Sequence, residues 1–459
     1  MDIFITQEEI NKQKKTAAKV RERFAKLGAV PKVFIQTYGC QQNEADSERL
    51  CGLALLCGYG RTDNAKDADL IIVNTCAIRE HAELRTLSIT GGYKKLKEQK
   101  PEMLIMLCGC MAQEEHIRKK LYSSYPYVDA VFGTDMNHRL PDIIWDSLHS
   151  EKRLSFVSDL LHNEFGVIAE ETPVERLSKY KAWVSVMYGC DNYCTYCVVP
   201  YVRGRERSRN SDEIFKEVQK LIREGYKDIT LLGQNVNSYN GDYSFPGLMK
   251  RISSFDGDFR LRFMTSHPKD ASRELIDVMA SSDKIARHFH LPVQSGSNEV
   301  LRRMNRRYTR EKYLETAFYI RERLPDAALT TDIICGFPGE TEEQFEDTVS
   351  LVREVGFDMI YTFLYSSRPG TAAAEMDNQI PHGEKTKRFN RLSEIENEIA
   401  QKINESYIGN TIRVLSDGEN GRSSQNKIVN FDKPYPDGEF VNVKITAAHP
   451  YALDGEVLI

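Results

Sequence analysis

Short apolar segments alternate with helical patterns over most of the chain, and this alternation restricts the fold more than any other feature of the sequence. Three such segments lie near the N-terminus, at residues 33–40, 69–76 and 103–110, and each ends in a cysteine. Helical patterns at residues 45–57 and 79–97 separate them. Buried strands joined by helices form parallel sheets, so we expect an N-terminal α/β domain built on a buried parallel sheet.

Six further segments of the same kind occupy the central part of the chain. They lie near residues 183–188, 229–232, 261–264, 289–293, 329–334 and 359–365, with helical patterns such as 211–225 and 341–356 between them. Six strand–helix units are too few to close an eight-stranded barrel. We therefore predict a partial (β/α)6 TIM-like barrel whose site lies at the carboxyl ends of its strands.

The two ends of the chain have other patterns. A helix expected at residues 385–406 is followed by four short strands, at 411–415, 427–431, 440–445 and 455–459. These predict a small all-β barrel like the oligonucleotide-binding modules, with a structural cap as the alternative. Residues 2–27 have apolar side chains at helical spacing, which indicates an amphipathic arm; a solvated extension is the alternative.

These patterns predict a protein of the α/β class with several domains. The expected divisions are an N-terminal arm at 1–30, the first α/β domain at 31–148, a linker at 149–175, the central barrel at 176–407 and the C-terminal barrel at 408–459. A chain of 459 residues has room for this number of domains.

The loop after the first central strand carries Cys190, Cys194 and Cys197. A C-x-x-x-C-x-x-C loop can hold three irons of a [4Fe-4S] cluster and leave the fourth iron without a protein ligand, open to chemistry. The alternative is a zinc knuckle, but a closed zinc site takes four ligands and no fourth Cys or His follows at the usual spacing.

The cysteines at the ends of the three N-terminal strands are Cys40, Cys76 and Cys110. Right-handed crossovers bring successive strand ends to one edge of a parallel sheet, so these thiols should converge and suggest a second cluster. Buried structural cysteines are the alternative. Cys51 and Cys57 are interpreted as packing residues in a helix. Cys108 is expected to share a strand face with Cys110 and to be a bystander.

Glycines and uncharged polar residues follow the central strands, where they can let the backbone approach a ligand and donate hydrogen bonds to it. Together they predict a ligand pocket at this edge of the barrel. The candidates are Tyr196, Gly233, Gln234, Ser266, Gln294, Ser297, Gly336 and Pro338. His267 and His290 are interpreted as polar rim residues, and Cys335 as an ordinary buried residue.

Charge gives a mixed signal about nucleic acid. The chain has 62 Lys and Arg against 67 Asp and Glu, a net charge of −5, so phosphate must be bound by local patches. Two runs, 203–209 and 302–310, hold nine arginines directly after motifs of the expected active edge. Arginine forks suit phosphate and bases, which favours a nucleic-acid substrate; a solvated charged face is the alternative.

From about Lys32 onward the chain resembles the methylthiotransferase family of the radical S-adenosylmethionine (SAM) superfamily. The resemblance rests on residues 38–48, 74–83, 109–113 and 294–297, together with the Cys190–Cys197 loop. It departs from the family at Gln42, where Met is usual, and in the segment 417–422, which is shorter than usual in the C-terminal TRAM domain.

The resemblance implies cofactors and their ligands. Cys40, Cys76 and Cys110 are expected to bind an auxiliary [4Fe-4S] cluster, and Cys190, Cys194 and Cys197 a second [4Fe-4S] cluster that binds SAM. The eight strand-end candidates are the expected contacts of SAM. Cofactors must carry a reaction at an unactivated aromatic C–H bond, so no catalytic acid or base is predicted.

The implied reaction adds a methylthio group to C2 of an N(6)-dimethylallyladenosine next to a tRNA anticodon, with one SAM as methyl donor and another as radical source. The expected partners are the tRNA anticodon stem-loop and an external electron donor. Alternatives within the family act on threonylcarbamoyladenosine in tRNA or on an aspartate of a ribosomal protein. A non-catalytic iron–sulfur protein that binds RNA is the alternative of another class.

The N-terminal residues do not read as a signal peptide, and the longest apolar run, around residues 103–112, is too short to cross a bilayer. We therefore expect a cytoplasmic monomer without a membrane partner.

Overall fold

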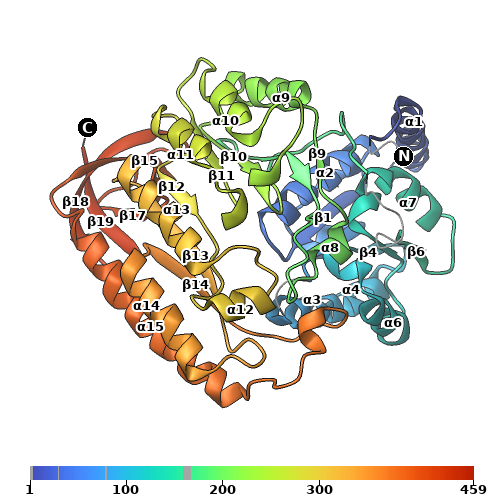
Figure 1. Ribbon diagram of the computed structural model, residues 1–459. Coiled ribbons are helices and arrows are strands. Elements are labelled where there is room, and N and C mark those ends of the chain that lie inside the picture. Colours follow the sequence, from blue (N-terminus) through green and yellow to red (C-terminus); the bar gives the residue numbers. More distant parts are fainter. Residues whose placement is uncertain (1–3, 29, 78–79, 159–166, 459) are drawn as a thin grey trace. The chain divides into compact units, whose positions relative to one another are not determined.

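The computed structural model describes residues 4–28, 30–77, 80–158 and 167–458 (Figure 1). The chain forms two compact units. The first unit contains the described residues up to Leu177 together with 187–191 and 198–209. The second contains residues 178–186, 192–197 and the described residues from Asn210 onward.

A six-stranded parallel sheet forms the centre of the first unit, in the order β2-β1-β3-β4-β5-β6. The strands are β1 (Lys32–Thr37), β2 (Gly60–Arg61), β3 (Leu70–Thr75), β4 (Leu104–Gly109), β5 (Ala130–Phe132) and β6 (Leu154–Phe156). Every residue of β3 and β4 is buried, as expected for strands covered by helices on both faces. The predicted parallel α/β fold is confirmed, while β6 lies within the segment expected to be a linker.

Helices cover both faces of this sheet. One face packs against α1 (Gln7–Lys26), α2 (Gln41–Leu56) and α7 (Leu140–Ser147). The other packs against α3 (Glu80–Gly92), α4 (Lys94–Gln99), α5 (Cys110–Gln113), α6 (Glu115–Ser124) and α8 (Val199–Arg203). Two short 3₁₀ helices, η1 (Ala65–Asp67) and η2 (Thr134–Arg139), and a small hairpin of β8 (Met187–Tyr188) and β9 (Arg207–Ser208) complete the unit.

The N-terminal arm is a helix that belongs to this core. Thr6 caps it by accepting a hydrogen bond from the backbone N–H of Glu9. Ala17 and Val20 are fully buried among the residues of α2 and α7. The alternative of a solvated extension is therefore wrong, because the apolar stripe of the arm has a partner that the local sequence does not reveal.

The second unit contains six parallel strands whose spatial order follows the chain. They are β7 (Lys181–Ser185), β10 (Asp228–Leu232), β11 (Arg260–Phe263), β12 (His288–His290), β13 (Ala328–Cys335) and β14 (Met359–Leu364). Backbone hydrogen bonds from Leu261 to Lys284 and from Ala286 to Leu261 join β11 to the segment that leads into β12. This is the partial barrel that the six strand–helix units predicted.

The helices of the second unit are α9 (Ser211–Arg223), α10 (Phe245–Ser253), α11 (Arg273–Ala280), α12 (Asn298–Arg303), α13 (Arg310–Arg323), α14 (Glu342–Val355) and α15 (His382–Glu405), with 3₁₀ turns η3 (Val236–Ser238), η4 (Pro268–Asp270) and η5 (Ala372–Ala374). A capping box between Thr341 and Gln344 starts α14, as its sequence predicted.

The C-terminal strands close into a barrel in the order β15-β16-β17-β19-β18 (Figure 1, orange to red). They are β15 (Thr411–Ser416), β16 (Asn420–Ser423), β17 (Ile428–Phe431), β18 (Phe440–Ala448) and β19 (Ala452–Leu458). The sequence predicted the barrel but missed β16, which has no apolar alternation. Instead, Gly421 lets β16 approach β15, where a Cβ would lie 2.3 Å from the carbonyl oxygen of Leu415.

Buried arginines attach this barrel to the strands of the larger one. Arg260 Nη1 donates to the carbonyl oxygens of Arg422 and Ser423, at 2.9 and 3.1 Å. Arg262 Nη2 donates to Ser423 O at 2.7 Å. Backbone carbonyls of the small barrel therefore find their partners in the larger barrel, so the two parts stabilise one another.

Candidate functional site

Three cysteines follow the adjacent strands β1, β3 and β4 at one edge of the first sheet. Cys40 stands at the N-terminus of α2 and is half-buried, while Cys76 and Cys110 are buried. Because β1 pairs with β3 and β3 with β4, their carboxyl ends are neighbours. The structure thus brings the three predicted ligand residues to the same edge, as the topology of parallel strands requires.

Hydrogen bonds of two asparagines join the carboxyl ends of β1 and β3. Asn43 Nδ2 donates to Asn74 Oδ1 at 3.1 Å and to Thr75 O at 3.0 Å. Asn74 Nδ2 returns a hydrogen bond of 2.8 Å to Asn43 O. Asn43 Oδ1 also accepts from the thiol of Cys40 at 3.4 Å. Both asparagines lie within the motifs that carry the family resemblance, but no role was predicted for either.

Gly109 turns the chain between Cys108 and Cys110. Its φ of 92° is in the left-handed region, and a Cβ would lie 2.4 Å from Thr75 O. Cys110 therefore leaves the strand to begin α5, while Cys108 packs into the hydrophobic core on the other side of the sheet. The expectation that the two cysteines share a strand face is wrong because this turn breaks the period of the strand.

The spacing of the sulfur atoms bears on the type of metal centre. Among the described residues, only Glu83, Glu114 and His116 form a trio of possible ligands whose atoms all lie within 4.8 Å of one another. The sulfurs of Cys40, Cys76 and Cys110 are thus spread more widely. A single tetrahedral zinc with Zn–S bonds of about 2.3 Å would need them roughly 3.8 Å apart. Thiolates that bind different irons of a cluster can be farther apart, so the donor set fits a cluster better.

A buried arginine contacts one of these sulfurs. Arg203, at the end of α8, is only 5% exposed. Its Nε donates to Cys110 Sγ at 3.2 Å and its Nη2 to Asp46 Oδ2 at 2.9 Å. Burial alone would lower the pKa of Arg203, but the thiol of Cys110 and the carboxylate of Asp46 raise that pKa well above its usual value. The guanidinium is therefore a permanent cation beside Cys110.

Gln42 helps to hold Asp46 in place for its contact with Arg203. Its Nε2 donates to Asp46 Oδ1 at 3.1 Å, and its side chain is buried one turn before Asp46 on α2. The residue that departs from the family pattern thus orients the carboxylate that holds Arg203.

Four of the nine arginines in the two basic runs are buried, contrary to the predicted phosphate-binding surfaces. Arg203, Arg207, Arg209 and Arg306 are each no more than 7% exposed. Arg209, for example, pairs with Glu170 at 2.7 Å. The exposed members of the runs are Arg205, Arg302 and Arg307, and Arg302 pairs with Glu299. The buried arginines of the runs pair with carboxylates and carbonyl oxygens that are distant in the sequence.

The Cys190–Cys197 loop has ordered partners on each side. The backbone N–H of Cys190 donates to Gly204 O at 3.2 Å in the first unit. In the second unit, Arg306 Nη1 donates to Cys194 Sγ and to the hydroxyl of Tyr196, each at 3.4 Å, while Nη2 donates to Pro292 O at 2.7 Å. Arg306 is thus a positioning residue for this loop, a role that its sequence context did not reveal.

Buried polar atoms without a hydrogen-bond partner in the described structure gather at the ends of β10 and β11. They are Asn235 Oδ1, both amide atoms of Asn237, Ser266 Oγ and His267 Nε2. A hydrogen bond of 3.0 Å from the backbone of Val236 to Thr265 O joins the two loops. Such atoms cost free energy unless a bound polar ligand satisfies them, so these strand ends are the best candidate for the cofactor pocket.

His267 lies in this pocket in its neutral form. Burial, followed by the charge of Arg306, lowers the pKa of His267 far below its usual value. Its Nδ1 accepts from the backbone N–H of Lys269 at 3.2 Å, which assigns the ring proton to Nε2. The Nε2–H of this rim residue is therefore available as a hydrogen-bond donor in the pocket. His290, in contrast, has Thr330 and Asp332 as partners.

The other predicted contacts lie at the remaining strand ends. Gly233 and Gln234 directly follow β10, and Gln294 follows β12, held by hydrogen bonds to Asp332 O and from Ile334 N. Gln294 has a φ of 70°, an uncommon conformation for a residue with a side chain. Four consecutive strand ends thus carry the predicted polar and glycine residues.

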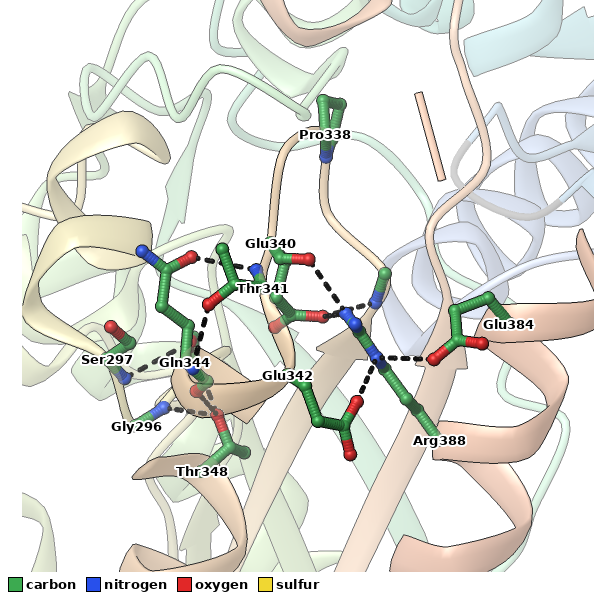
Figure 2. A network of polar contacts seen from close by, with 12 residues as sticks. Gly296, Ser297, Pro338, Glu340, Thr341, Glu342, Gln344, Thr348, Glu384 and Arg388 are labelled. Atoms are coloured by element: carbon green, nitrogen blue, oxygen red, sulfur yellow. Dashed lines mark hydrogen bonds and ion pairs between the residues drawn. The ribbon is translucent and has the colours of Figure 1, made fainter. Parts of the chain in front are cut away.

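Figure 2 shows how helices fix the last of these loops. Arg388 on α15 pairs with Glu340 at 2.9 Å, and the same carboxylate accepts from the backbone N–H of Gly336 at 2.8 Å. Thr348 on α14 accepts from the backbone N–H of Gly296, next to Ser297, at 2.9 Å. Pro338 lies at the bend of the loop, and its carbonyl oxygen accepts from Arg303. These loops are therefore preorganised.

The remaining cysteines behave as packing residues. Burial raises the pKa of Cys51 to about 11, and that of Cys57 and Cys335 to about 12. All three are buried, so they stay protonated at neutral pH and are poor nucleophiles.

Comparisons with known proteins identify the class. Residues 184–352 match the model of the radical SAM superfamily, residues 32–133 that of the uncharacterized protein family UPF0004, and residues 405–458 the TRAM domain. The structure is similar to the radical S-adenosylmethionine methyltransferase TsrM from Kitasatospora setae, with a TM-score of 0.56, 14% identity and 75% of each chain covered. The cobalamin-dependent S-adenosylmethionine radical enzyme OxsB gives a TM-score of 0.52 at 11% identity, over 80% of this chain and 56% of that one. The fold is thus that of a radical SAM protein.

Curated relatives define the family more closely. The chain is 44% identical to the tRNA-2-methylthio-N(6)-dimethylallyladenosine synthase of Acetivibrio thermocellus, over 100% of this chain and 98% of that protein. It is 48% identical to the enzyme of the same name from Clostridium botulinum strain Langeland, over 94% and 98%. The chain belongs to the family of tRNA-2-methylthio-N(6)-dimethylallyladenosine synthases. None of the helices in the described ranges has the length and apolar character needed to span a bilayer.

Proposed function

We propose that the protein adds a methylthio group to C2 of N(6)-dimethylallyladenosine next to the anticodon of tRNA. The observation that carries the proposal is the second cysteine triad, Cys40, Cys76 and Cys110, at the strand ends of a separate α/β unit. A radical alone can remove hydrogen from an adenine, but inserting sulfur needs a second centre that can present sulfur. The names of the relatives point to the same reaction.

In this proposal each triad holds one [4Fe-4S] cluster. Cys190, Cys194 and Cys197 bind the cluster that chelates SAM, and Cys40, Cys76 and Cys110 bind the auxiliary cluster. Both donor sets consist of three soft thiolate ligands, which suit iron–sulfur clusters and leave one iron open. When bound, these groups supply the radical, the methyl group and the sulfur of the product.

The residues of the chain bind and orient rather than exchange protons. Asn235, Asn237, Ser266 and neutral His267 offer the hydrogen bonds that the polar groups of SAM require. The preorganised loops with Gly233, Gln294, Ser297 and Gly336 form the remaining walls. Tyr196 and Cys194 are held in place by Arg306. No side chain is assigned as a catalytic acid or base, because the cofactors carry the chemistry.

The tRNA anticodon loop is single-stranded, so the modified adenosine can be splayed out of its stack and into a pocket. The dimethylallyl group is apolar, whereas a threonylcarbamoyl group carries a carboxylate that would demand a dedicated cation in the pocket. We further propose that the protein acts in the cytoplasm as a monomer and receives electrons from an external donor.

Parallel assays with three substrates test the proposal. Reconstituted protein, reductant and SAM are incubated with dimethylallyl-modified tRNA, threonylcarbamoyl-modified tRNA or ribosomal protein, and the methylthio product is quantified by mass spectrometry. We expect product only from the first. Preferential modification of either other substrate would overturn the assignment. Absence of both product and 5′-deoxyadenosine, compared with a Cys194→Ala control, would favour the non-catalytic RNA-binding alternative.

A further inference from the structure

Arg203 connects the cluster site of the first unit to a buried chain of polar side chains. Gln42 donates to Asp46, Asp46 accepts from Arg203, and Arg203 donates to Cys110 Sγ at 3.2 Å. The side chains of Arg203 and Asp46 are 5% and 6% exposed. Burying an ion pair is costly, and replacing such a pair with apolar residues is often neutral or stabilising. A structural role alone therefore does not explain why one edge of the guanidinium is directed at a cysteine sulfur.

The hydrogen bond from Arg203 to Cys110 Sγ would stabilise the negative charge of a thiolate that binds a cluster. A metal-bound thiolate carries negative charge, and adding an electron to a cluster increases the negative charge of the site. Hydrogen bonds to the sulfurs and nearby cations favour the reduced state and raise the reduction potential. The effect is large where water is excluded, because the local dielectric is low.

We propose that Arg203 is a positioning residue of the auxiliary cluster: it orients Cys110 Sγ and raises the reduction potential of the cluster, while Asp46 holds the guanidinium in place. This rests on the proposed function, because it needs Cys110 to be a cluster ligand. Arg203 donates to the ligand atom itself through Nε, whereas Asp46 contacts Nη2 of the guanidinium, so the cation is the nearer charge and dominates at the sulfur.

The chain offers a matched control in the same arginine run. Arg209 pairs with Glu170 at 2.7 Å, and their side chains are 6% and 15% exposed. The double variants Arg203→Gln/Asp46→Asn and Arg209→Gln/Glu170→Gln each remove one buried ion pair and leave no carboxylate without its counter-charge. Arg203→Lys keeps the charge but cannot donate to the sulfur and the carboxylate in the same planar geometry.

The test is made in the full chain with Cys190, Cys194 and Cys197 replaced by Ala, so that only the auxiliary cluster is titrated. Iron and sulfide content are measured first, and the midpoint potential is then followed by EPR during reductive titration. We expect a more negative potential in Arg203→Gln/Asp46→Asn, a smaller negative shift in Arg203→Lys, and the parental potential in Arg209→Gln/Glu170→Gln. Asp46→Asn alone should shift the potential in the positive direction.

The outcomes separate the two proposals. If the parent with its three Ala replacements binds no cluster, the proposed function fails at its auxiliary site. If the cluster is bound and its potential is unchanged in both Arg203 variants, the role of Arg203 is overturned. If the Arg203 double variant does not fold, the Arg203→Lys and Asp46→Asn shifts decide, because a purely structural pair predicts no shifts of opposite sign.

Discussion

At the scale of single residues, the arginines show that charge and exposure are separate properties. The two runs contain nine arginines, and four of them are nearly inaccessible. Their partners are buried acceptors, such as Asp46 for Arg203 and Pro292 O for Arg306. Buried cations of this kind order the loops around cysteines and have no free surface to offer to phosphate.

The exposed arginines are the ones to test for tRNA binding. Arg302→Gln/Arg307→Gln should weaken binding of an anticodon stem-loop and flatten the plot of log K against log salt concentration by about 0.7–0.9 for each phosphate that is no longer neutralised. Fluorescence anisotropy at several salt concentrations measures this slope. Arg273→Gln/Arg323→Gln removes two exposed arginines outside the runs and should leave the slope unchanged. Equal slopes for both pairs would leave Arg302 and Arg307 as solvated charges.

Two glycines with nearly the same φ angle differ in what an added Cβ would meet. Gly109 has a φ of 92° and Gly225 a φ of 90°, but only at Gly109 would a Cβ collide, with Thr75 O at 2.4 Å. Gly225→Ala should cost about 1 kcal/mol of unfolding free energy, from the left-handed conformation alone. Gly109→Ala should cost at least ~3 kcal/mol, because the backbone must also move. Denaturant titration followed by circular dichroism compares them; equal losses would contradict the close approach.

At the scale of elements, a buried carboxyl group on one helix accepts a hydrogen bond from the backbone of a strand. Glu396 on α15 accepts a hydrogen bond of 2.8 Å from the backbone N–H of Ile360 on β14. Burial raises the pKa of Glu396 to about 7. The native state therefore holds the proton more tightly than the unfolded chain, in which the pKa is about 4.3.

This carboxyl group makes stability depend on pH. Below about pH 4 it is protonated in both states and has no effect; as pH rises to about 7 its ionisation increasingly favours the unfolded chain, by up to about 3 kcal/mol. Glu396→Gln should therefore stabilise the protein at pH 8 and change little at pH 4.5. Urea unfolding at both pH values measures the difference. An equal effect at the two values would mean that Glu396 is not titrating in this range.

The contacts between the two barrels differ in how much they contribute to the free energy of unfolding, because some are buried and others are exposed. Arg260 satisfies two buried carbonyls, whereas Arg413 makes an exposed pair with Asp258 at 2.6 Å. Arg260→Met should cost roughly 3 kcal/mol, because buried acceptors lose their donor. Arg413→Gln should cost less than about 1 kcal/mol. Thermal unfolding of both variants tests this order, and a reversed order would contradict the attachment described for the small barrel.

At the scale of the whole molecule, the chain divides its proposed chemistry between two cysteine triads. Only the SAM-binding cluster is needed to form 5′-deoxyadenosine. Cys110→Ala should therefore retain SAM cleavage and lose methylthiolation, whereas Cys194→Ala should lose both. Chromatography of 5′-deoxyadenosine and mass spectrometry of tRNA nucleosides provide the two measurements. Loss of cleavage in folded Cys110→Ala that retains the SAM-binding cluster would contradict this division.

Much of the architecture is encoded locally. Short apolar segments separated by helical patterns predicted the parallel sheet and the six strands of the partial barrel, because strands covered on both faces are apolar throughout. Alternating strands predicted the small closed barrel, because only one face of each strand is buried there. The capping box at Thr341 and Gln344 started α14 as expected. The positions of Cys40, Cys76 and Cys110 at adjacent strand ends followed from the handedness of parallel crossovers. Strands β2, β5, β6, β9 and β16 were missed because they are short and have little pattern.

The local pattern of residues is enough to predict where the chain forms strands and helices, and which edge of each sheet carries its cysteines, glycines and amides. Which charged and polar groups are buried, and what they contact, depends on how distant segments pack. Arg203 and Asp46 are 157 residues apart in the chain, and the sequence around neither residue indicates that the two form an ion pair. Periodicity arises between neighbours in sequence and can be read from them, whereas the partners of a buried charge are chosen by packing between distant segments.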